Sequence, residues 1–431
     1  MDIRNKAVFA DDLTGAMDAG VAVLSKGLSV NVVFDYQNIS SLSPQGLVIF
    51  AMQSRNIPEK MAYARIVENI VSIRNLGLKL VYKKVDSTLR ENLGSELAAI
   101  LDMNPRLMIA FAPALPYNGR QTKHGSQYVN GLPLTKSDIS KDPFSTVRKS
   151  NISKILAEQT DYKSGVIDIV CVRQGQSCIA QKLREFKEQG IRIAIFDVME
   201  DSDFETIVSG MNASELPLLP CGSAGLFPYI FGNDEAAGFK RRKLYRNDRP
   251  ALIISGSPAI ATKRQIQTAV HEGIPYVKLN IRKIISDETD YLQEYKRVVS
   301  QVMGLLAAKQ SVIIDGAGDS KSAILKQNRE DAVKILRDGI TIQNCLSNVA
   351  SEAVGNQMVS GIFVAGGDTA MSIFRKLGAF GVRITNELEP YVPSGRLLGG
   401  KYHGIPIITK AGGFGSEAVM VKSISHLKGE L

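Results

Sequence analysis

The segment Lys6-Ala7-Val8-Phe9-Ala10-Asp11-Asp12-Leu13-Thr14-Gly15 decides the fold class of this chain. The apolar residues at its start predict a short buried strand. Apolar residues at helical spacing in Ala16–Leu24 predict a helix, which ends at Lys26-Gly27. Val30–Phe34 is again strand-like, so a strand, a polar turn, a helix and a second strand follow one another. This order is the opening of a doubly wound α/β sheet.

The polar turn between this strand and helix is not a dinucleotide-binding loop. Asp11 and Asp12 stand where the glycines of a Gly-x-Gly-x-x-Gly pattern would be, and two carboxylates repel a pyrophosphate. They suit sugar hydroxyls, a proton or Mg²⁺ better. One residue of the turn is expected to cap the helix, and the pair of acids points equally to a ligand site.

A second polar turn is Lys84-Val85-Asp86-Ser87-Thr88-Leu89-Arg90, between the strand-like run Leu78–Tyr82 and the helix-like run Glu91–Leu101. Polar groups that gather where a strand ends and a helix begins are typical of ligand sites in open α/β sheets. A cation, an acid, two hydroxyls and a guanidinium are the groups that a small, anionic, polyhydroxylated molecule needs. The alternative is a solvated turn in which Ser87 or Thr88 caps the helix.

Two further strand ends in the first 120 residues carry an arginine. Leu47–Ala51 is followed by Arg55, and Leu107–Ala112 by a proline-containing loop that reaches Arg120. Arg55 is suited to clamp a carboxylate through a forked pair of hydrogen bonds, although a surface ion pair would explain it equally well. Arg120 is a second candidate anion contact. Four strand ends with polar groups in one half of the chain therefore indicate a single site.

The second half restarts the α/β alternation after a polar, charge-rich stretch. We place the boundary there, which gives an N-terminal domain at 1–235, a C-terminal domain at 250–431 and a linker at about 236–249. Strands are predicted at Ala251–Ile254, Tyr276–Leu279, Ser311–Asp315, Gly361–Ala365 and Ile405–Thr409.

Three strand ends of the second half carry glycine-rich turns. They are Ser255-Gly256-Ser257, Gly366-Gly367-Asp368-Thr369 and Lys410-Ala411-Gly412-Gly413-Phe414-Gly415. Bare backbone N–H groups at a helix N-terminus favour an anion, so these turns predict a phosphate site, to which Lys410 adds a charge and Ser255 a hydroxyl. Glycine is also ordinary turn chemistry, but three such turns in one domain favour phosphate binding. The Walker and protein-kinase patterns are absent from the sequence.

The composition excludes several classes of protein. The net charge is +9, but aromatic residues are 6%, tryptophan is absent and no nucleic-acid-binding motif occurs, so attraction of small anions explains the charge. The four cysteines and four histidines lack metal-ligand spacing, which argues against a zinc site. No signal peptide and no apolar run of membrane-spanning length is present, so we expect a cytoplasmic protein with reduced cysteines and no membrane partner.

Six motifs, taken in order, resemble the four-carbon acid sugar kinases, a bacterial family of two-domain enzymes that phosphorylate C4 sugar acids with ATP. They are Ala10–Ala16, Lys83–Arg90, Gly222–Leu226, Ser255–Ser257, Gly366–Ala370 and Thr409–Gly415. The resemblance covers essentially the whole chain. It implies two α/β domains with mostly parallel sheets and a ligand cleft between them, the first binding the sugar acid and the second ATP.

Within this family, members that act on 3-oxo-tetronates tend to carry a Cys-Ser-Thr-Phe-Asp-Ser type of sequence in the second polar turn. Lys84–Arg90 instead resembles the branch that acts on D-threonate or D-erythronate, and D-threonate is our first expectation. 4-Hydroxy-L-threonine is a related alternative. A non-catalytic sugar-acid sensor is an alternative of a different class, and a dehydrogenase is disfavoured by the missing dinucleotide pattern.

The strand ends and the resemblance together predict the roles of individual residues. Arg55 and Lys84 are expected to hold the substrate carboxylate, and Asp12, Asp86 and Ser87 its hydroxyls. Either Asp12 or Asp86 is expected to accept the proton of the attacking hydroxyl. Asp11, Val85, Thr88, Arg90 and Arg120 complete the predicted substrate site. ATP is assigned to Ser255, Gly256, Gly366, Gly367, Asp368, Thr369, Lys410, Gly412, Gly413 and Gly415. Mg²⁺ is expected with ATP, and its ligands, the substrate stereochemistry and homo-oligomer formation are left open.

Overall fold

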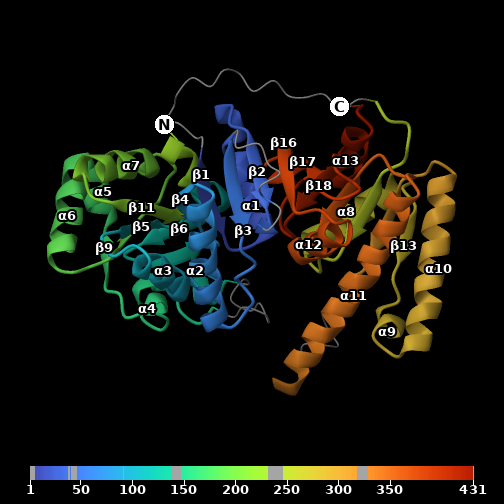
Figure 1. Cartoon of the computed structure of the whole chain (residues 1–431), viewed down its shortest axis with the longest axis horizontal. Helices are drawn as coiled ribbons and strands as arrows, with labels where there is room; N and C mark the ends of the chain where they lie inside the picture. Colours follow the sequence, from blue (N-terminus) through green and yellow to red (C-terminus); the bar gives the residue numbers. More distant parts are fainter. Residues whose placement is uncertain are drawn as a thin grey trace. The chain divides into compact units, whose positions relative to one another are not determined.

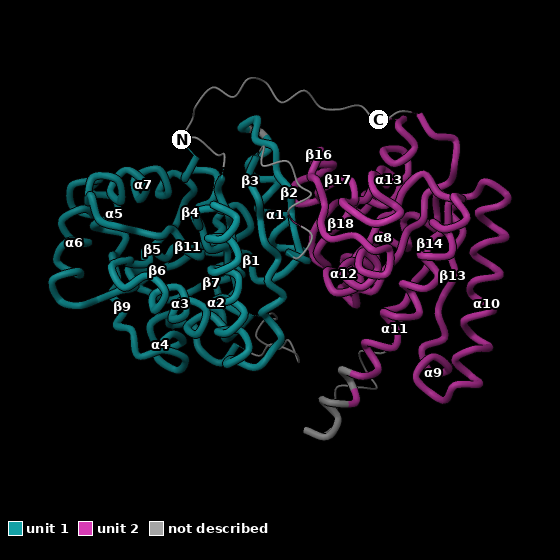
Figure 2. Tube along the Cα trace, in the orientation of Figure 1, with its two compact units in different colours: residues 1–36, 40–239 teal, residues 37–39, 240–431 magenta. Residues whose placement is uncertain are grey.

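The computed structural model describes residues 5–36, 39, 46–90, 92–137, 147–231, 246–317 and 329–430. The chain divides into two compact units (Figure 2). Unit 1 comprises Met1–Tyr36 and Ser40–Phe239, and unit 2 comprises Gln37–Ile39 and Lys240–Leu431. Most of the predicted linker at 236–249 lies outside the described residues.

Unit 1 is built on eight described strands in the order β2-β3-β1-β4-β11-β5-β10-β9, and every neighbouring pair is parallel. The strands are β1 (Lys6–Ala10), β2 (Val30–Val33), β3 (Leu47–Ala51), β4 (Lys79–Lys84), β5 (Met108–Ala112), β9 (Ser164–Ile167), β10 (Ile193–Phe196) and β11 (Leu218–Gly222). β1, β2, β3 and β5 are apolar along almost their whole length because helices cover both faces of a parallel sheet (Figure 1).

β1 lies between β3 and β4, so the chain leaves it first toward one side of the sheet and later toward the other. This is a topological switch point, where the loops after neighbouring parallel strands diverge and leave room for a ligand. The carboxyl ends of β1, β3 and β4 therefore share one edge of the sheet.

The helices of unit 1 connect these strands. They are α1 (Leu13–Ala22), α2 (Glu59–Asn75), α3 (Leu93–Asp102), α4 (Ile152–Leu156), α5 (Ile169–Gln174), α6 (Gln176–Glu188) and α7 (Asp203–Ser214). Asp12 caps α1, since its Oδ1 accepts a hydrogen bond from the Gly15 N–H at 2.6 Å. The expectation that one residue of the first polar turn caps the helix is confirmed.

A small antiparallel sheet, which the sequence did not predict, follows β5. It contains β6 (Arg120–Lys123), β7 (Ser126–Val129) and β8 (Leu132–Pro133). Gln127 on β7 is fully buried and donates from its Nε2 to the Ser87 carbonyl at 2.7 Å. The small sheet therefore supports the second polar turn.

Unit 2 has a sheet in the order β13-β14-β12-β15-β18-β17-β16, in which the first five strands are parallel and the last two antiparallel. The strands are β12 (Leu252–Ser255), β13 (Tyr276–Lys278), β14 (Val312–Asp315), β15 (Ile362–Ala365), β16 (Gly381–Glu389), β17 (Val392–Leu398) and β18 (Pro406–Lys410). β12 lies between β14 and β15 and is a second switch point. Two mixed α/β units with mostly parallel sheets confirm the predicted fold class.

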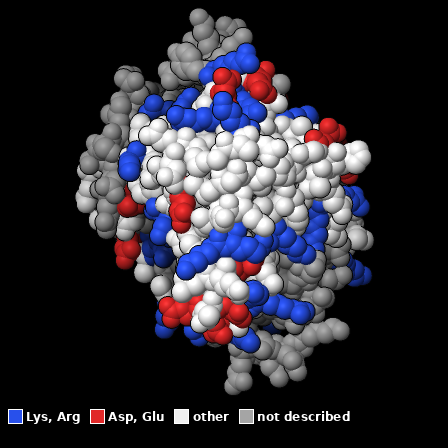
Figure 3. All heavy atoms as spheres, turned by 90° about the vertical axis from the view of Figure 1, so that its right-hand side faces the viewer, with Lys and Arg blue, Asp and Glu red and all other residues white. Residues whose placement is uncertain are grey.

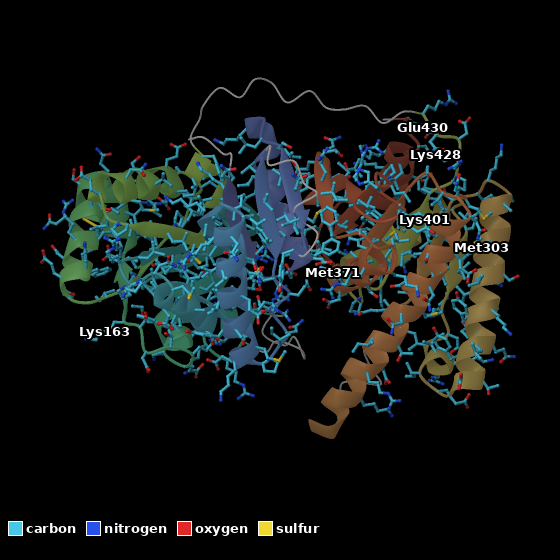
Figure 4. All side chains as sticks on the ribbon, viewed as in Figure 1. Lys163, Met303, Met371, Lys401, Lys428 and Glu430 are labelled. Carbon is cyan, nitrogen blue, oxygen red and sulfur yellow. A yellow bond between two sulfur atoms is a disulfide. The ribbon has the colours of Figure 1, made fainter. Side chains whose placement is uncertain are left out.

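The helices of unit 2 are α8 (Ile260–His271), α9 (Ile281–Ile284), α10 (Glu288–Ala307), α11 (Arg329–Gly355), α12 (Gly367–Lys376) and α13 (Val419–Leu427). Their apolar faces cover the sheet. Met371 on α12, labelled in Figure 4, is 4% exposed. None of the helices described in either unit is long and apolar enough to cross a membrane.

Positive and negative charges are mixed on the face of unit 2 that Figure 3 shows. Lys and Arg side chains gather there in bands, and Asp and Glu side chains lie among them. Acidic groups thus interrupt the positive charge, whereas a nucleic-acid-binding face is expected to be more uniformly basic.

The cysteines differ from the sequence expectation. Cys171 on α5 and Cys178 on α6 form a disulfide, whereas we expected reduced thiols. The turn at Gly175 between the two helices brings their Cα atoms to 5.6 Å, a separation that a disulfide requires. Cys221 and Cys345 are buried free thiols.

A buried ion pair links β4 to α3. Lys83 Nζ lies 2.5 Å from Glu96 Oε2, and both side chains are fully buried. Lys83 Nζ also donates to the Lys84 carbonyl at 3.1 Å. A buried charge that loses its partner is strongly destabilising, so this pair holds the end of β4 against the helix that follows it.

We expect Glu96→Ala to lower the free energy of unfolding by about 3–5 kcal/mol, because it leaves the Lys83 ammonium without its counter-charge. Glu185→Ala is the matched control: it removes an exposed i,i+3 ion pair with Lys182 and should cost less than about 1 kcal/mol. Urea unfolding of both variants measures the difference. Equal losses would show that the Lys83–Glu96 pair contributes no more than a surface pair.

Candidate functional site

Charged side chains from three strand ends converge at the switch point of unit 1. Asp11 follows β1, Arg55 follows β3 and Lys84 ends β4. Arg55 Nε donates to Asp11 Oδ2 at 2.8 Å, and its guanidinium also contacts Asp12 Oδ2 at 3.1 Å. Lys84 Nζ lies 3.4 Å from the other oxygen of Asp11. The structure therefore joins the predicted residues of three separate loops into one network.

The network keeps its members charged. Burial alone would raise the pKa of Asp11, but Arg55, Lys84 and Lys83 outweigh it and hold that pKa well below its usual range. Burial would lower the pKa of Lys84, but the carboxylates of Asp11 and Asp12 raise it above its usual value. At neutral pH the site therefore contains an ionised acid and a charged amine that are both shielded from water.

The second polar turn is organised around Asp86. Its Oδ2 accepts hydrogen bonds from Thr88 Oγ1 at 2.5 Å and from Arg90 Nε at 2.7 Å. Burial opposes ionisation of Asp86, but Arg90 and Arg55 together hold its pKa well below the usual range. Leu89 has a φ of 58°, which is strained for a bulky residue. Such strain persists only where the surroundings fix the backbone, as the Asp86 hydrogen bonds do here.

Gly15 lets Lys84 reach the network. A Cβ atom at position 15 would lie 2.2 Å from Lys84 Nζ and 2.8 Å from Asp12 Oδ1. The ammonium thus occupies the space that any larger residue on this face of α1 would fill. This close approach explains the glycine that follows Thr14 in the first polar turn.

Two residues of the predicted substrate site have other contacts. Val85 is fully buried, and its N–H donates to the Gly222 carbonyl at 2.8 Å, which ties the end of β4 to β11. Arg120 begins β6 and donates from its guanidinium to the Asn118 carbonyl at 2.8 Å. The described contacts do not join either side chain to the Asp11 network, and their substrate roles remain predictions.

Sequence reasoning missed three polar residues in and beside this site. Asn92 donates from Nδ2 to the carbonyls of Ser54 and Ile57, at 2.8 and 2.9 Å, and so fixes the loop that carries Arg55. Gln127 fixes the second polar turn, as described above. Asp18 is buried on α1, and an acid among the apolar residues of that helix was a signal that could have revealed it.

The three glycine turns of unit 2 also follow adjacent parallel strands, β12, β15 and β18. A Cβ at Gly256 would lie 2.0 Å from Thr369 Oγ1, and one at Gly412 would lie 2.5 Å from Ser257 Oγ. Gly366 precedes α12 with a φ of +117°, which a larger side chain rarely adopts. The turns therefore pack against one another through positions where only glycine fits.

Lys410 ends β18 and supports the third glycine turn. Its Nζ donates to Thr262 Oγ1 at 2.9 Å and to the carbonyls of Ala411 and Gly412, both at 3.1 Å. Burial lowers the pKa of Lys410 to about 8. The structure thus assigns this amine to the loop backbone, and its predicted contact with a phosphate remains a prediction.

Buried hydroxyl groups at these strand ends lack protein partners. Ser255 Oγ and Thr409 Oγ1 are both buried without a hydrogen-bond partner among the described residues. Unsatisfied buried hydroxyls are costly and are often satisfied by a ligand or water. They fit a polar ligand at the carboxyl ends of β12 and β18.

The described residues contain no group of three or more His, Cys, Asp or Glu side chains that could hold a metal ion. Mg²⁺ bound together with a nucleotide needs only one or two carboxylates, because phosphate oxygens and water complete its coordination. The Mg²⁺ that we expect with ATP therefore remains a prediction.

We expect Arg55→Ala to destabilise unit 1 by about 2–4 kcal/mol at pH 7, because Asp11 then loses the strongest of its counter-charges and keeps Lys84 and Lys83. A carboxyl with a lowered pKa stabilises the fold above its unfolded pKa, near 4, and loses that effect as the pH falls. The loss should therefore shrink at pH 3, where Asp11 of the variant takes up a proton.

The control is Lys149→Ala, which removes an exposed pair with Glu158. Denaturant unfolding at both pH values provides the measurement. A loss for Arg55→Ala that is independent of pH would argue against the charge network.

Comparison with known proteins places both units in described domain families. Residues 6–230 match the model of a sugar-binding N-terminal domain, and residues 252–420 match that of a nucleotide-binding C-terminal domain. A solved protein from Salmonella typhimurium LT2 has the same fold, with a TM-score of 0.79 at 21% identity over 97% of this chain and 98% of that one. A Haemophilus influenzae structure has a TM-score of 0.73 at 22% identity, over 97% of this chain and 98% of that one.

Among curated proteins, a D-threonate kinase of Salmonella typhimurium is 30% identical over 98% of both chains. A D-erythronate kinase of Heliobacterium modesticaldum is 28% identical over 99% of this chain and 97% of that one. A 3-oxo-tetronate kinase of Pseudomonas savastanoi is 25% identical over 97% of this chain and 96% of that one. The full-length matches and the two domain models show that this chain belongs to the four-carbon acid sugar kinase family.

Proposed function

We propose that this family member transfers the γ-phosphoryl group of ATP to the 4-hydroxyl of D-threonate, giving 4-phospho-D-threonate and ADP. The observation that carries the proposal is the buried Asp11–Arg55–Lys84 network beside the Asp86 turn in a sugar-binding domain. The D-threonate kinase of Salmonella typhimurium, at 30% identity, supports this choice of acid. The D-erythronate kinase at 28% makes D-erythronate the first competitor.

Arg55 and Lys84 are the proposed contacts of the substrate carboxylate. Lys84 Nζ has three donors, and its one described partner, Asp11 Oδ1, is 3.4 Å away, which is long for a charge-assisted hydrogen bond. A substrate carboxylate offers this ammonium a shorter bond. The hydroxyls of the sugar acid would then be held by Asp12, Asp86 and Ser87.

Asp12 is the favoured acceptor of the proton that leaves the 4-hydroxyl. Asp86 is bound by Thr88 and Arg90, and its lowered pKa makes it a weak base. Asp12 Oδ1 accepts the helix-capping bond, and its Oδ2 is 3.1 Å from Arg55. Phosphoryl transfer depends mostly on positioning and electrostatics, so the base assists a reaction whose geometry is set by the other groups.

In unit 2, the N–H groups of the turns at Gly366–Thr369 and Gly412–Gly415 are the proposed phosphate ligands, and Ser255 supplies a hydroxyl. Lys410 supports the third turn by donating hydrogen bonds to the carbonyls of Ala411 and Gly412. Mg²⁺, when bound with ATP, would neutralise charge on the phosphates, and Asp368 in the first turn of α12 is the acidic residue of these loops.

Substrate choice is tested by coupling ADP release to NADH oxidation with D-threonate, D-erythronate, 3-oxo-tetronates and 4-hydroxy-L-threonine. We expect D-threonate to give the highest kcat/KM, with ATP consumption that depends on Mg²⁺. Phosphorus NMR of the product should show a phosphate ester at C4. A higher kcat/KM for D-erythronate would make D-erythronate the substrate in place of D-threonate. Binding of the sugar acid without ADP release would indicate a sensor.

The base is tested with Asp12→Asn, which keeps the helix cap because Asn caps as well as Asp. We expect kcat to fall on the order of 10²–10⁴-fold, the usual cost of losing a general base. Asp86→Asn should mainly raise KM. Asp102→Asn, at the far end of α3, is the control. A near-normal kcat for Asp12→Asn would exclude this residue as the base.

A further inference from the structure

Asp18 is a buried acid that the proposed chemistry does not use. It lies on α1, three residues after Gly15, so the two positions share one face of the helix. Gly15 is the residue against which Lys84 Nζ rests. Asp18 is 9% exposed, and its Oδ1 has no hydrogen-bond partner among the described residues. An unsatisfied buried carboxyl oxygen one turn from the Lys84 ammonium calls for a physical explanation.

Charged groups from several elements act on Asp18. Lys84 from β4 and Arg55 after β3 favour its ionised form, whereas Asp12 at the helix cap and Asp11 after β1 oppose it. Of the other elements that pack against α1, β2 and β3 contain no titratable residue. β1 carries Lys6 at its start, η1 (Leu24–Lys26) carries Lys26, and η6 (Phe227–Phe231) carries Tyr229. The two cations are already shared with Asp11 and Asp12, so little positive charge is left for a third carboxylate.

The balance of these effects keeps a proton on Asp18. Burial is the largest cause, and it raises the pKa of Asp18 to about 8 against the attraction of Lys84. At pH 7 the protonated form therefore exceeds the ionised form by roughly ten to one. A neutral carboxylic acid does not compete for an ammonium ion as a carboxylate does.

We propose that Asp18 is a positioning residue that acts through Lys84: while it holds its proton, the Lys84 ammonium is available to the carboxylate of the sugar acid, and once it ionises it competes for that ammonium. The inference rests on the proposed function, because it assigns the substrate carboxylate to Lys84. Binding is reciprocal, so the sugar acid in turn favours the protonated form of Asp18.

This arrangement predicts a specific dependence of substrate affinity on pH. Below about pH 8 the protonated form of Asp18 dominates and KM for the sugar acid is constant. Above it, KM rises by up to about tenfold per pH unit, because only the protonated form binds well. The value of kcat changes much less, since Asp18 does not touch the reacting atoms.

The test compares wild type with Asp18→Asn, which mimics the protonated acid and cannot ionise. KM and kcat for D-threonate are measured from pH 6 to 9.5. We expect the rise in KM of the wild type to disappear in Asp18→Asn, with KM near the wild-type value at pH 7. Asp201→Asn is the matched control, because burial also raises the pKa of Asp201, which precedes α7, three strands away from β4. The Asp201→Asn variant should keep the rise in KM above about pH 8.

A second readout is independent of catalysis. The unfolded chain loses the Asp18 proton near pH 4 and the folded chain near pH 8, so the wild-type fold is progressively destabilised between these values. The Tm of Asp18→Asn relative to that of the wild type should therefore increase as the pH rises from 5 to 8. Infrared difference spectra of the wild-type protein should show a protonated carboxyl that titrates near pH 8, and this signal keeps the test decisive if the variant does not fold.

The outcomes separate the two proposals. A wild-type KM that stays flat to pH 9.5, or a rise that persists in Asp18→Asn, overturns the role of Asp18 even if D-threonate is phosphorylated. A missing carboxyl signal overturns it as well. A carboxyl that titrates near pH 8 in a protein that phosphorylates no tetronate overturns the proposed function, and the proposed role of Asp18 with it.

Discussion

The site of unit 1 depends on the neutralisation of one buried carboxylate. Asp11 has no exposed surface, and an isolated charge in such a place would cost several kcal/mol. Arg55 and Lys84 provide the compensating charges, and each arrives from a different strand end. Because the acid requires both cations, the loops after β1, β3 and β4 are held in one arrangement before any ligand binds. Preorganised charges of this kind are what phosphoryl transfer requires.

The two units solve different binding problems with the same strand plan. Each has a central strand, β1 or β12, at which the chain changes direction across the sheet. In unit 1 the loops beside that strand carry charged side chains, which are the groups that we propose contact the sugar acid. In unit 2 they carry glycines where the loops approach one another closely, as between Gly256 and Thr369, and the N–H groups of these turns are the proposed phosphate ligands. The order of the strands places the loops at one edge of the sheet, and the residues of those loops determine which ligand they suit.

Much of this could be predicted from the sequence because strand ends carry local signals. The strand, polar turn and helix around Asp11 and Asp12 were predicted within a few residues. The apolar run Val166–Val170 predicts a strand along its whole length, but the strand ends at Ile167, because Asp168 caps α5 and Ile169 is already helical. The antiparallel pair β16 and β17 was missed, since its alternation is irregular at two bulges. The amine of Lys410 could not be placed either, because its partners on α8 and its own loop are set by tertiary packing.

The contact between Gly15 and the Lys84 ammonium constrains how this site can diverge. A side chain at position 15 and a lysine at position 84 compete for the same volume, so each restricts the other over evolutionary time. A lineage that exchanged Lys84 for a shorter residue would release position 15 to vary. In the reverse direction, a larger residue at position 15 forces the end of the Lys84 side chain to move. Substitutions at positions 15 and 84 are therefore expected to depend on each other.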